Sequence, residues 1–111
     1  RPLFNPLQEE LYILVLSSPG HALACHLVAK GSPNLVRATP ADVLRLVLLS
    51  GGQRFILAHN HPSLDPQPSS DDLAFTRRVS QAADLLGLAL VDHVIFADTA
   101  YCSMRREGLM G

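Results

Sequence analysis

Hydrophobic residues along this chain fall into short runs that are separated by turn-forming residues. The first run, Leu11–Leu16, is continuous and β-favouring, which is typical of a strand covered on both faces. Ser17–Gly20 is a turn signal, and residues 22–29 can return as the second arm of a hairpin. The pattern weakly indicates one more short β segment at Leu35–Arg37. The N-terminal part of the chain therefore predicts a β-hairpin.

Two later segments have the pattern of helices. Thr39–Asp42 begins the first, because Thr can cap a helix, Pro suits the first helical position and Asp favours the positive end of the helix dipole. Its positions up to Leu49 are apolar almost all round, which predicts a buried helix that ends at Gly51 and Gly52. The second helix opens at Ser69–Asp72, which has the form of a capping box, and stops at Gly87.

The remaining apolar runs predict three further strands. Residues 54–58 form a short run next to a helix, which favours a central strand, and residues 88–97 and Tyr101–Met104 follow the second helix. The order is β-β-(β)-α-β-α-β-β. We expect an α/β domain in which a mixed β-sheet is sandwiched by helices.

Composition narrows the class of protein. The 111 residues, 48% hydrophobic and 17% charged, suit one compact domain over residues 1–111. A net charge of −1 supplies no field that would attract nucleic acid, and no apolar run is long enough to span a membrane. Cys25 and Cys102 form no C-x-x-C pair, so we expect a reducing, cytoplasmic location. Because the chain begins at Arg1 without Met, we expect it to be part of a longer protein.

Most of the unusual polar residues lie in one stretch, residues 59–72. His59 and His61 follow a strand and are two positions apart, so they share one face, with Cβ atoms about 6.6 Å apart. Both imidazoles can then reach one ion, and a carboxylate from the next helix can supply a third ligand. Spacing alone leaves two alternatives open, a metal site and two ordinary loop histidines. Three prolines restrict the loop, as a preorganised site requires, at Pro62, Pro66 and Pro68.

The same stretch resembles a known family. His59-x-His61-Pro62 followed by Ser69-x-x-Asp72 is similar to the JAMM (JAB/MPN) metalloprotease motif, and the full string from His59 to Ser69 resembles its RadC-like bacterial branch. Further matches to that branch are Gly31-x-x-Asn34, Pro40-x-x-Val43, Leu86-Gly87 and Asp92-His93-Val94-Ile95. The resemblance covers nearly all of the chain and implies a cytidine-deaminase-like α/β/α fold around a zinc ion. Leu64 departs from the branch, which usually has Gly there.

The resemblance also implies roles for single residues. His59, His61 and Asp72 correspond to the zinc ligands, which leaves the fourth position to water, as in catalytic zinc sites. The family places a Glu just before the first long strand, and Glu10 stands there with Glu9 as the alternative. Because side chains alternate along an extended segment, only one of the two can face the metal, and we predict Glu10.

The implied chemistry is metal-assisted hydrolysis. Glu10 would take a proton from water and pass it to the leaving amine, and Ser69 would donate to the oxyanion, in addition to capping its helix. We expect His93, within an apolar strand, to be a hydrogen-bonded structural residue and not a ligand. Asp65 or Asp92 could hold a ligand imidazole by its free N–H.

Two functions follow from these residues. The first is a zinc-dependent JAMM-type hydrolase that cleaves a peptide, isopeptide or related amide bond in a peptide or protein substrate. The alternative is a non-catalytic, metal-stabilised scaffold or protein-binding module of a DNA-repair-associated protein. Members of the family often carry a helix-hairpin-helix region upstream, and we expect these 111 residues to be the JAB/MPN part alone. The near-neutral charge gives no support for direct nucleic-acid binding, and the sequence leaves homo-oligomerisation open.

Overall fold

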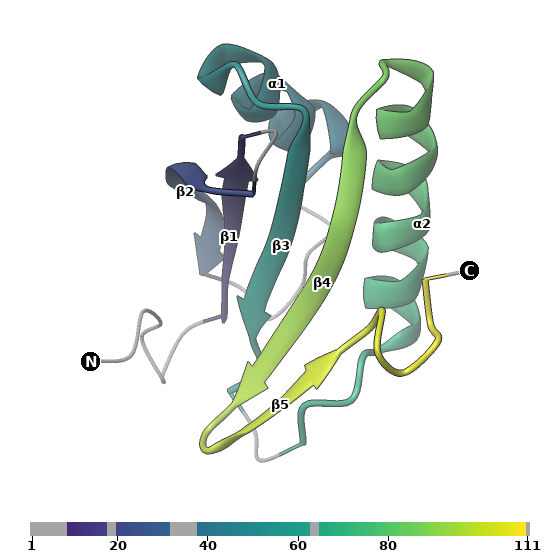
Figure 1. Ribbon diagram of the computed structural model, residues 1–111. Coiled ribbons are helices and arrows are strands. Elements are labelled where there is room, and N and C mark those ends of the chain that lie inside the picture. Colours follow the sequence, from purple (N-terminus) through teal and green to yellow (C-terminus); the bar gives the residue numbers. More distant parts are fainter. Residues whose placement is uncertain (1–8, 18–19, 32–37, 63–64, 111) are drawn as a thin grey trace.

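The computed structural model describes residues 9–17, 20–31, 38–62 and 65–110 and contains one five-stranded sheet. The sheet order is β2-β1-β3-β4-β5 (Figure 1). The strands are β1 (Glu9–Leu16), β2 (Ala22–Gly31), β3 (Arg54–Asn60), β4 (Ala89–Ala97) and β5 (Ala100–Ser103). Only β3 and β4 pair in parallel, and the other three neighbouring pairs are antiparallel. This confirms the predicted α/β class with a mixed sheet, in which the strand predicted to be central, β3, lies in the middle.

Two helices connect the strands on one side of the sheet. α1 (Pro40–Ser50) joins β2 to β3, and α2 (Ser70–Leu85) joins β3 to β4 and runs alongside β4 (Figure 1). Both helices contribute to one core with alternate residues of the strands. Its fully buried members are Leu11, Ile13, Val15, Val43, Val47, Phe55, Leu57, Val79 and Ala83. Within the described segments both helices therefore cover the same face, whereas helices on both faces were expected.

The opposite face of the sheet is only half-buried. It carries the intervening residues of the central strands, including Tyr12, Leu14, Ile56 and Ala58.

Neither of the helices formed by the described residues is long and apolar enough to cross a membrane.

Local signals place the ends of both helices. Thr39 caps α1 and Ser69 caps α2, and each hydroxyl accepts a hydrogen bond from the backbone N–H of an Asp three residues later. The carboxylates of Asp42 and Asp72 in turn accept hydrogen bonds from the backbone N–H groups of the two capping residues, at 3.0 and 2.9 Å. α1 ends at Gly51, whose φ of +76° is a left-handed conformation that favours glycine. The predicted capping residues are thus the observed ones.

Two strand ends differ from the prediction, and both differences affect the site. β1 begins at Glu9, two residues before the predicted start, because it pairs with β2 from that point on. β3 continues past Ala58 to Asn60, which places His59 within the strand. The weak β segment predicted at residues 35–37, and Leu64, lie outside the described residues.

Candidate metal centre

The buried polar residues gather at one end of the sheet. The carboxyl ends of the parallel strands β3 and β4 lie there beside the N-terminus of α2 (Figure 1). Burying a polar group costs free energy unless it finds a partner, so such a cluster marks a site or a hydrogen-bond network. Its members among the described residues are Glu9, Glu10, His59, Asn60, Asp72, Thr76 and His93.

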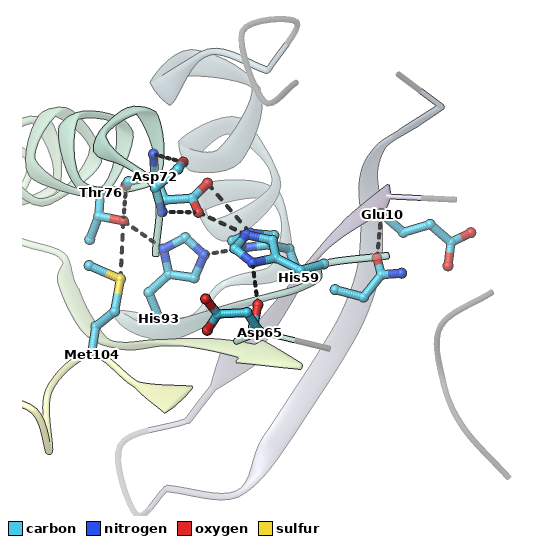
Figure 2. Close-up of polar contacts among 10 residues, drawn as sticks. Glu10, His59, Asp65, Asp72, Thr76, His93 and Met104 are labelled. Atoms are coloured by element: carbon cyan, nitrogen blue, oxygen red, sulfur yellow. Dashed lines mark hydrogen bonds and ion pairs between the residues drawn. The ribbon is translucent and has the colours of Figure 1, made fainter. Parts of the chain in front are cut away.

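His59 is the centre of this cluster. Its side chain is completely buried, and its Nδ1 lies 2.7 Å from Nε2 of His93 (Figure 2). Its other ring nitrogen, Nε2, has no hydrogen-bond partner among the described residues and lies 3.5 Å from Oδ1 of Asp72. Leaving a buried ring nitrogen without a partner costs about 1–3 kcal/mol, and a metal ion is one partner that would satisfy it.

His61 and Asp72 complete the group. Nε2 of His61 lies 2.9 Å from Oδ2 of Asp72, and Nδ1 of His61 lies 3.2 Å from the backbone oxygen of Asp65. The hydrogen bond to Asp72 raises the pKa of His61, against the effect of burial. Burial alone would raise the pKa of Asp72, but the adjacent imidazoles of His59 and His61 and the backbone N–H of Ser69 outweigh it and hold that pKa well below its ordinary range. The carboxyl group of Asp72 is therefore ionised at neutral pH.

These three side chains could hold one metal ion. One ligand atom of each lies within 4.8 Å of the others. Zinc bonds of about 2.0–2.1 Å in a tetrahedral site place ligand atoms about 3.4 Å apart, close to the 2.9 and 3.5 Å separations that involve Asp72. Two imidazoles and one carboxylate are also a donor set that catalytic zinc sites use. The unpartnered Nε2 of His59 and this donor set both fit the group that the resemblance implies.

The register of β1 against β3 separates the two candidate acids. Leu11 pairs with His59, so continuing the antiparallel register sets Glu10 opposite Asn60 and Glu9 opposite His61. In agreement, the backbone N–H of Glu10 donates to Oδ1 of Asn60 at 2.7 Å. Glu9 therefore shares the face of His59, whereas Figure 2 shows the side chain of Glu10 pointing away from the histidine. The predicted orientation of this pair is the reverse of the observed one.

Electrostatics connects Glu9 to the same group. Burial raises the pKa of Glu9, and the charges of His59 and His61 lower it in part. The carboxylate of Asp72 adds to the increase. The pKa of Glu9 is therefore influenced by all three members of the group. An acid whose pKa is raised by burial is also better suited to accept a proton near neutral pH.

Ser69 lies at the edge of the group on an exposed position at the start of α2. Its hydroxyl oxygen accepts a hydrogen bond from the backbone N–H of Asp72 at 3.1 Å. An accepted bond uses an oxygen lone pair, so the hydroxyl hydrogen is still available to another acceptor. The predicted helix-capping role is confirmed, and the oxyanion role stays a prediction.

Other residues surround the ligands in ways that the sequence only partly indicates. His93 is completely buried and hydrogen-bonded on both ring nitrogens, as expected of a structural residue. Asp65 contacts His61 through its backbone oxygen. The carboxylate of Asp92 instead accepts from the hydroxyl of Ser103 and from the backbone N–H of its neighbour His93. These bonds stabilise the pairing of β4 with β5 and do not orient a ligand imidazole. Thr76, whose hydroxyl lies 2.6 Å from Nδ1 of His93, was not predicted. Its one sequence signal is its position four residues after Asp72 on a helix.

Comparison with known protein families agrees with this geometry. A family model described as the RadC-like JAB domain matches residues 2–109. The chain belongs to that family. The resemblance seen in the sequence is thereby confirmed, and the sheet with its two helices is consistent with a JAB domain.

Curated relatives of this RadC-like JAB domain are longer proteins. The chain is similar to a UPF0758 protein of Carboxydothermus hydrogenoformans, with 39% identity over 102 residues that cover 92% of this chain and 45% of the relative. It is also similar to a UPF0758 protein of Aquifex aeolicus, with 38% identity over 107 residues that cover 96% of this chain and 46% of the relative. The chain thus spans just under half the length of these relatives. Their names state no activity.

Proposed function

We propose that this RadC-like JAB domain is a zinc-dependent hydrolase that cleaves a peptide, isopeptide or related amide bond. The observation that carries the proposal is the unpartnered Nε2 of His59, which is buried beside Asp72 and His61. A buried imidazole lone pair next to an ionised carboxylate is a strong ligand pair for a divalent cation. No described side chain donates a hydrogen bond to that lone pair.

A bound zinc ion would supply a Lewis acid that lowers the pKa of a coordinated water toward about 7 and polarises the scissile carbonyl. Glu9 accepts a proton from the attacking water and passes it to the leaving amine, because it faces the ligand group and its pKa is raised by burial. Ser69 donates its hydroxyl hydrogen to the oxyanion that forms on the carbonyl. This assigns the role predicted for Glu10 to its neighbour.

The exposure of the group supports a reactive rather than a closed site. The side chain of His61 is 15% exposed, whereas those of His59 and Asp72 are 0% and 4% exposed. A substrate can therefore approach from the side of His61. A structural zinc site has four protein ligands, but this group offers three, and one position is left for water or substrate.

Metal content and turnover together test the proposal. Purified protein is expected to contain about one zinc per chain, measured by elemental analysis. Screening against peptide and isopeptide libraries should find cleavage that Glu9→Gln abolishes while zinc is retained. Glu10→Gln is the matched control, because its side chain points away from the group, and it should keep most of the activity. If Glu10→Gln were inactive and Glu9→Gln active, the assignment of the base would be wrong.

The same experiment separates the enzyme from its alternative. A protein that binds one zinc per chain but cleaves no library member would be a metal-stabilised scaffold or protein-binding module. A protein that binds no zinc, even when zinc is added, would refute the metal centre itself.

A further inference from the structure

A chain of hydrogen bonds connects His59 to the backbone of α2. Oγ1 of Thr76 lies 2.8 Å from the backbone oxygen of Asp72 and 2.6 Å from Nδ1 of His93. Nε2 of His93 lies 2.7 Å from Nδ1 of His59 (Figure 2). All the side chains in the chain are buried, so water does not compete for these bonds. This series of hydrogen bonds starts at the backbone of Asp72 and ends at His59, whose Nε2 lies beside the carboxylate of the same Asp72.

The positions of the hydrogens in this chain follow from its first member. A carbonyl oxygen carries no hydrogen, so the hydroxyl of Thr76 must donate to the backbone oxygen of Asp72. A hydroxyl has one hydrogen, so Oγ1 of Thr76 can only accept from Nδ1 of His93. The sulfur of Met104, 3.7 Å from the same hydroxyl, is a weak acceptor and does not change this order.

The same reasoning assigns the hydrogens of His93 and His59. A neutral imidazole carries one hydrogen, so Nε2 of His93 has a lone pair and accepts from Nδ1 of His59. The single hydrogen of His59 is then on Nδ1, which leaves the lone pair on Nε2. This is the nitrogen that has no hydrogen-bond partner among the described residues.

We propose that Thr76 and His93 are positioning residues that hold His59 in the tautomer whose Nε2 can bind a metal. The inference rests on the proposed zinc site for its purpose, although the tautomer itself does not require an ion. If His93 instead donated its Nε2 hydrogen to Nδ1 of His59, Nε2 of His59 would carry the hydrogen and could not be a ligand. Partners of this kind, which fix the tautomer of a metal-binding His, typically change metal affinity by about 10–100-fold when they are removed.

Thr76→Val and Thr76→Ser form the test pair. Val has nearly the shape of Thr but replaces the hydroxyl with a methyl group, whereas Ser keeps the hydroxyl. In Thr76→Val, Nδ1 of His93 loses its acceptor, so His93 gains by moving its hydrogen to Nε2 and donating to His59. We expect His59 in that variant to carry its hydrogen on Nε2. Zinc affinity, measured by competition with a chromophoric chelator, should fall about 10–100-fold. Thr76→Ser should retain the affinity of the unaltered protein.

The tautomers themselves are the second readout, and they need neither zinc nor activity. Heteronuclear NMR of nitrogen-labelled, chelator-treated protein reports which ring nitrogen of each His carries the hydrogen. The unaltered protein should show His59 and His93 both protonated on Nδ1. Protonation of His59 on Nε2 in that protein, or an unchanged tautomer in Thr76→Val, would overturn the proposal. If the unaltered protein bound no zinc, the metal centre would be refuted, yet these spectra would still decide whether Thr76 and His93 set the tautomer.

Discussion

The two capping boxes allow one prediction to be worked out in detail, because the same residue type occupies the same helical position in two different surroundings. Asp42 in α1 and Asp72 in α2 occupy the same helical position and accept the same backbone hydrogen bond. The side chain of Asp42 is 41% exposed and lies near Arg45, whereas that of Asp72 is 4% exposed and lies beside two histidines. Asp→Asn at each position keeps an oxygen for the cap and removes the charge. Any difference between the two variants therefore reports the site and not the helix.

The expected magnitudes follow from these contacts. Asp42→Asn weakens an exposed cap and removes an exposed ion pair with Arg45, which together cost about 0.5–1 kcal/mol of unfolding free energy. Asp72→Asn also loses a buried, charge-assisted hydrogen bond with His61, and such bonds contribute about 1.5–3 kcal/mol. Zinc at about 100 times its dissociation constant should stabilise the unaltered protein by about 2.7 kcal/mol. For a domain of this size that is an increase in Tm of about 11 °C, at about 4 °C per kcal/mol.

Thermal unfolding followed by circular dichroism, after chelator treatment and again with zinc, measures both quantities. Asp42→Asn should have a slightly lower Tm than the unaltered protein and the full increase on adding zinc. Asp72→Asn should have a lower Tm still and lose most of that increase, because a neutral amide is a poor zinc ligand. An undiminished zinc effect in Asp72→Asn would refute the assignment of Asp72 as a ligand. Loss of the effect in both variants would show that the helix ends, and not the ligands, control binding.

Three further predictions concern the stability of the domain, each measured by urea unfolding. A Cβ at Gly52 would clash with Cγ1 of Val15 and with the backbone oxygen of Leu16, so Gly52→Ala should cost about 1–3 kcal/mol, and a variant as stable as the unaltered protein would contradict this packing. Leu57 is completely buried, so Leu57→Ala should cost about 2–5 kcal/mol, whereas Leu49→Ala, at a position 78% exposed, should change stability by about 0.5 kcal/mol or less. Backbone and side-chain hydrogen bonds from Thr39 lower the pKa of Asp42 below its ordinary 3.8, so the folded state releases this proton more readily than the unfolded state. The contribution of Asp42 should be complete above pH 3.8 and disappear as the pH falls through the folded pKa, so that Asp42→Asn and the unaltered protein converge in strong acid.

Local signals in the sequence predicted the elements well, because each is decided by a few neighbouring residues. The caps at Thr39 and Ser69 and the stop at Gly51 depend on hydrogen bonds and backbone angles within one helical turn. The spacing of His59 and His61, with Asp72 after the loop, was sufficient to bring a donor set together once β3 and α2 formed. These parts of the fold and of the site are therefore readable from the chain alone.

The side on which each acid of β1 lies could not be read in this way. Glu9 and Glu10 are adjacent, both are buried, and a shift of one residue in strand register exchanges the faces of the two. The register is set by the pairing of Leu11 with His59, which is a contact between residues nearly fifty positions apart. Thr76 was missed for a related reason. Its role depends on His93 from β4, which approaches α2 only in the folded domain.

Asp72 explains why local and distant contacts meet in one place. Its carboxylate closes the capping box of α2 and contacts His61, while its backbone oxygen accepts from Thr76. The first contact fixes where the helix starts, the second joins the helix to the end of β3, and the third begins the hydrogen-bond chain that reaches His59. A change in the position of the first helical turn would therefore alter a ligand, its angle to the histidines and the tautomer of His59 together. This coupling gives a physical reason for a metal site at a helix N-terminus, because the helix cap already fixes the position of the carboxylate.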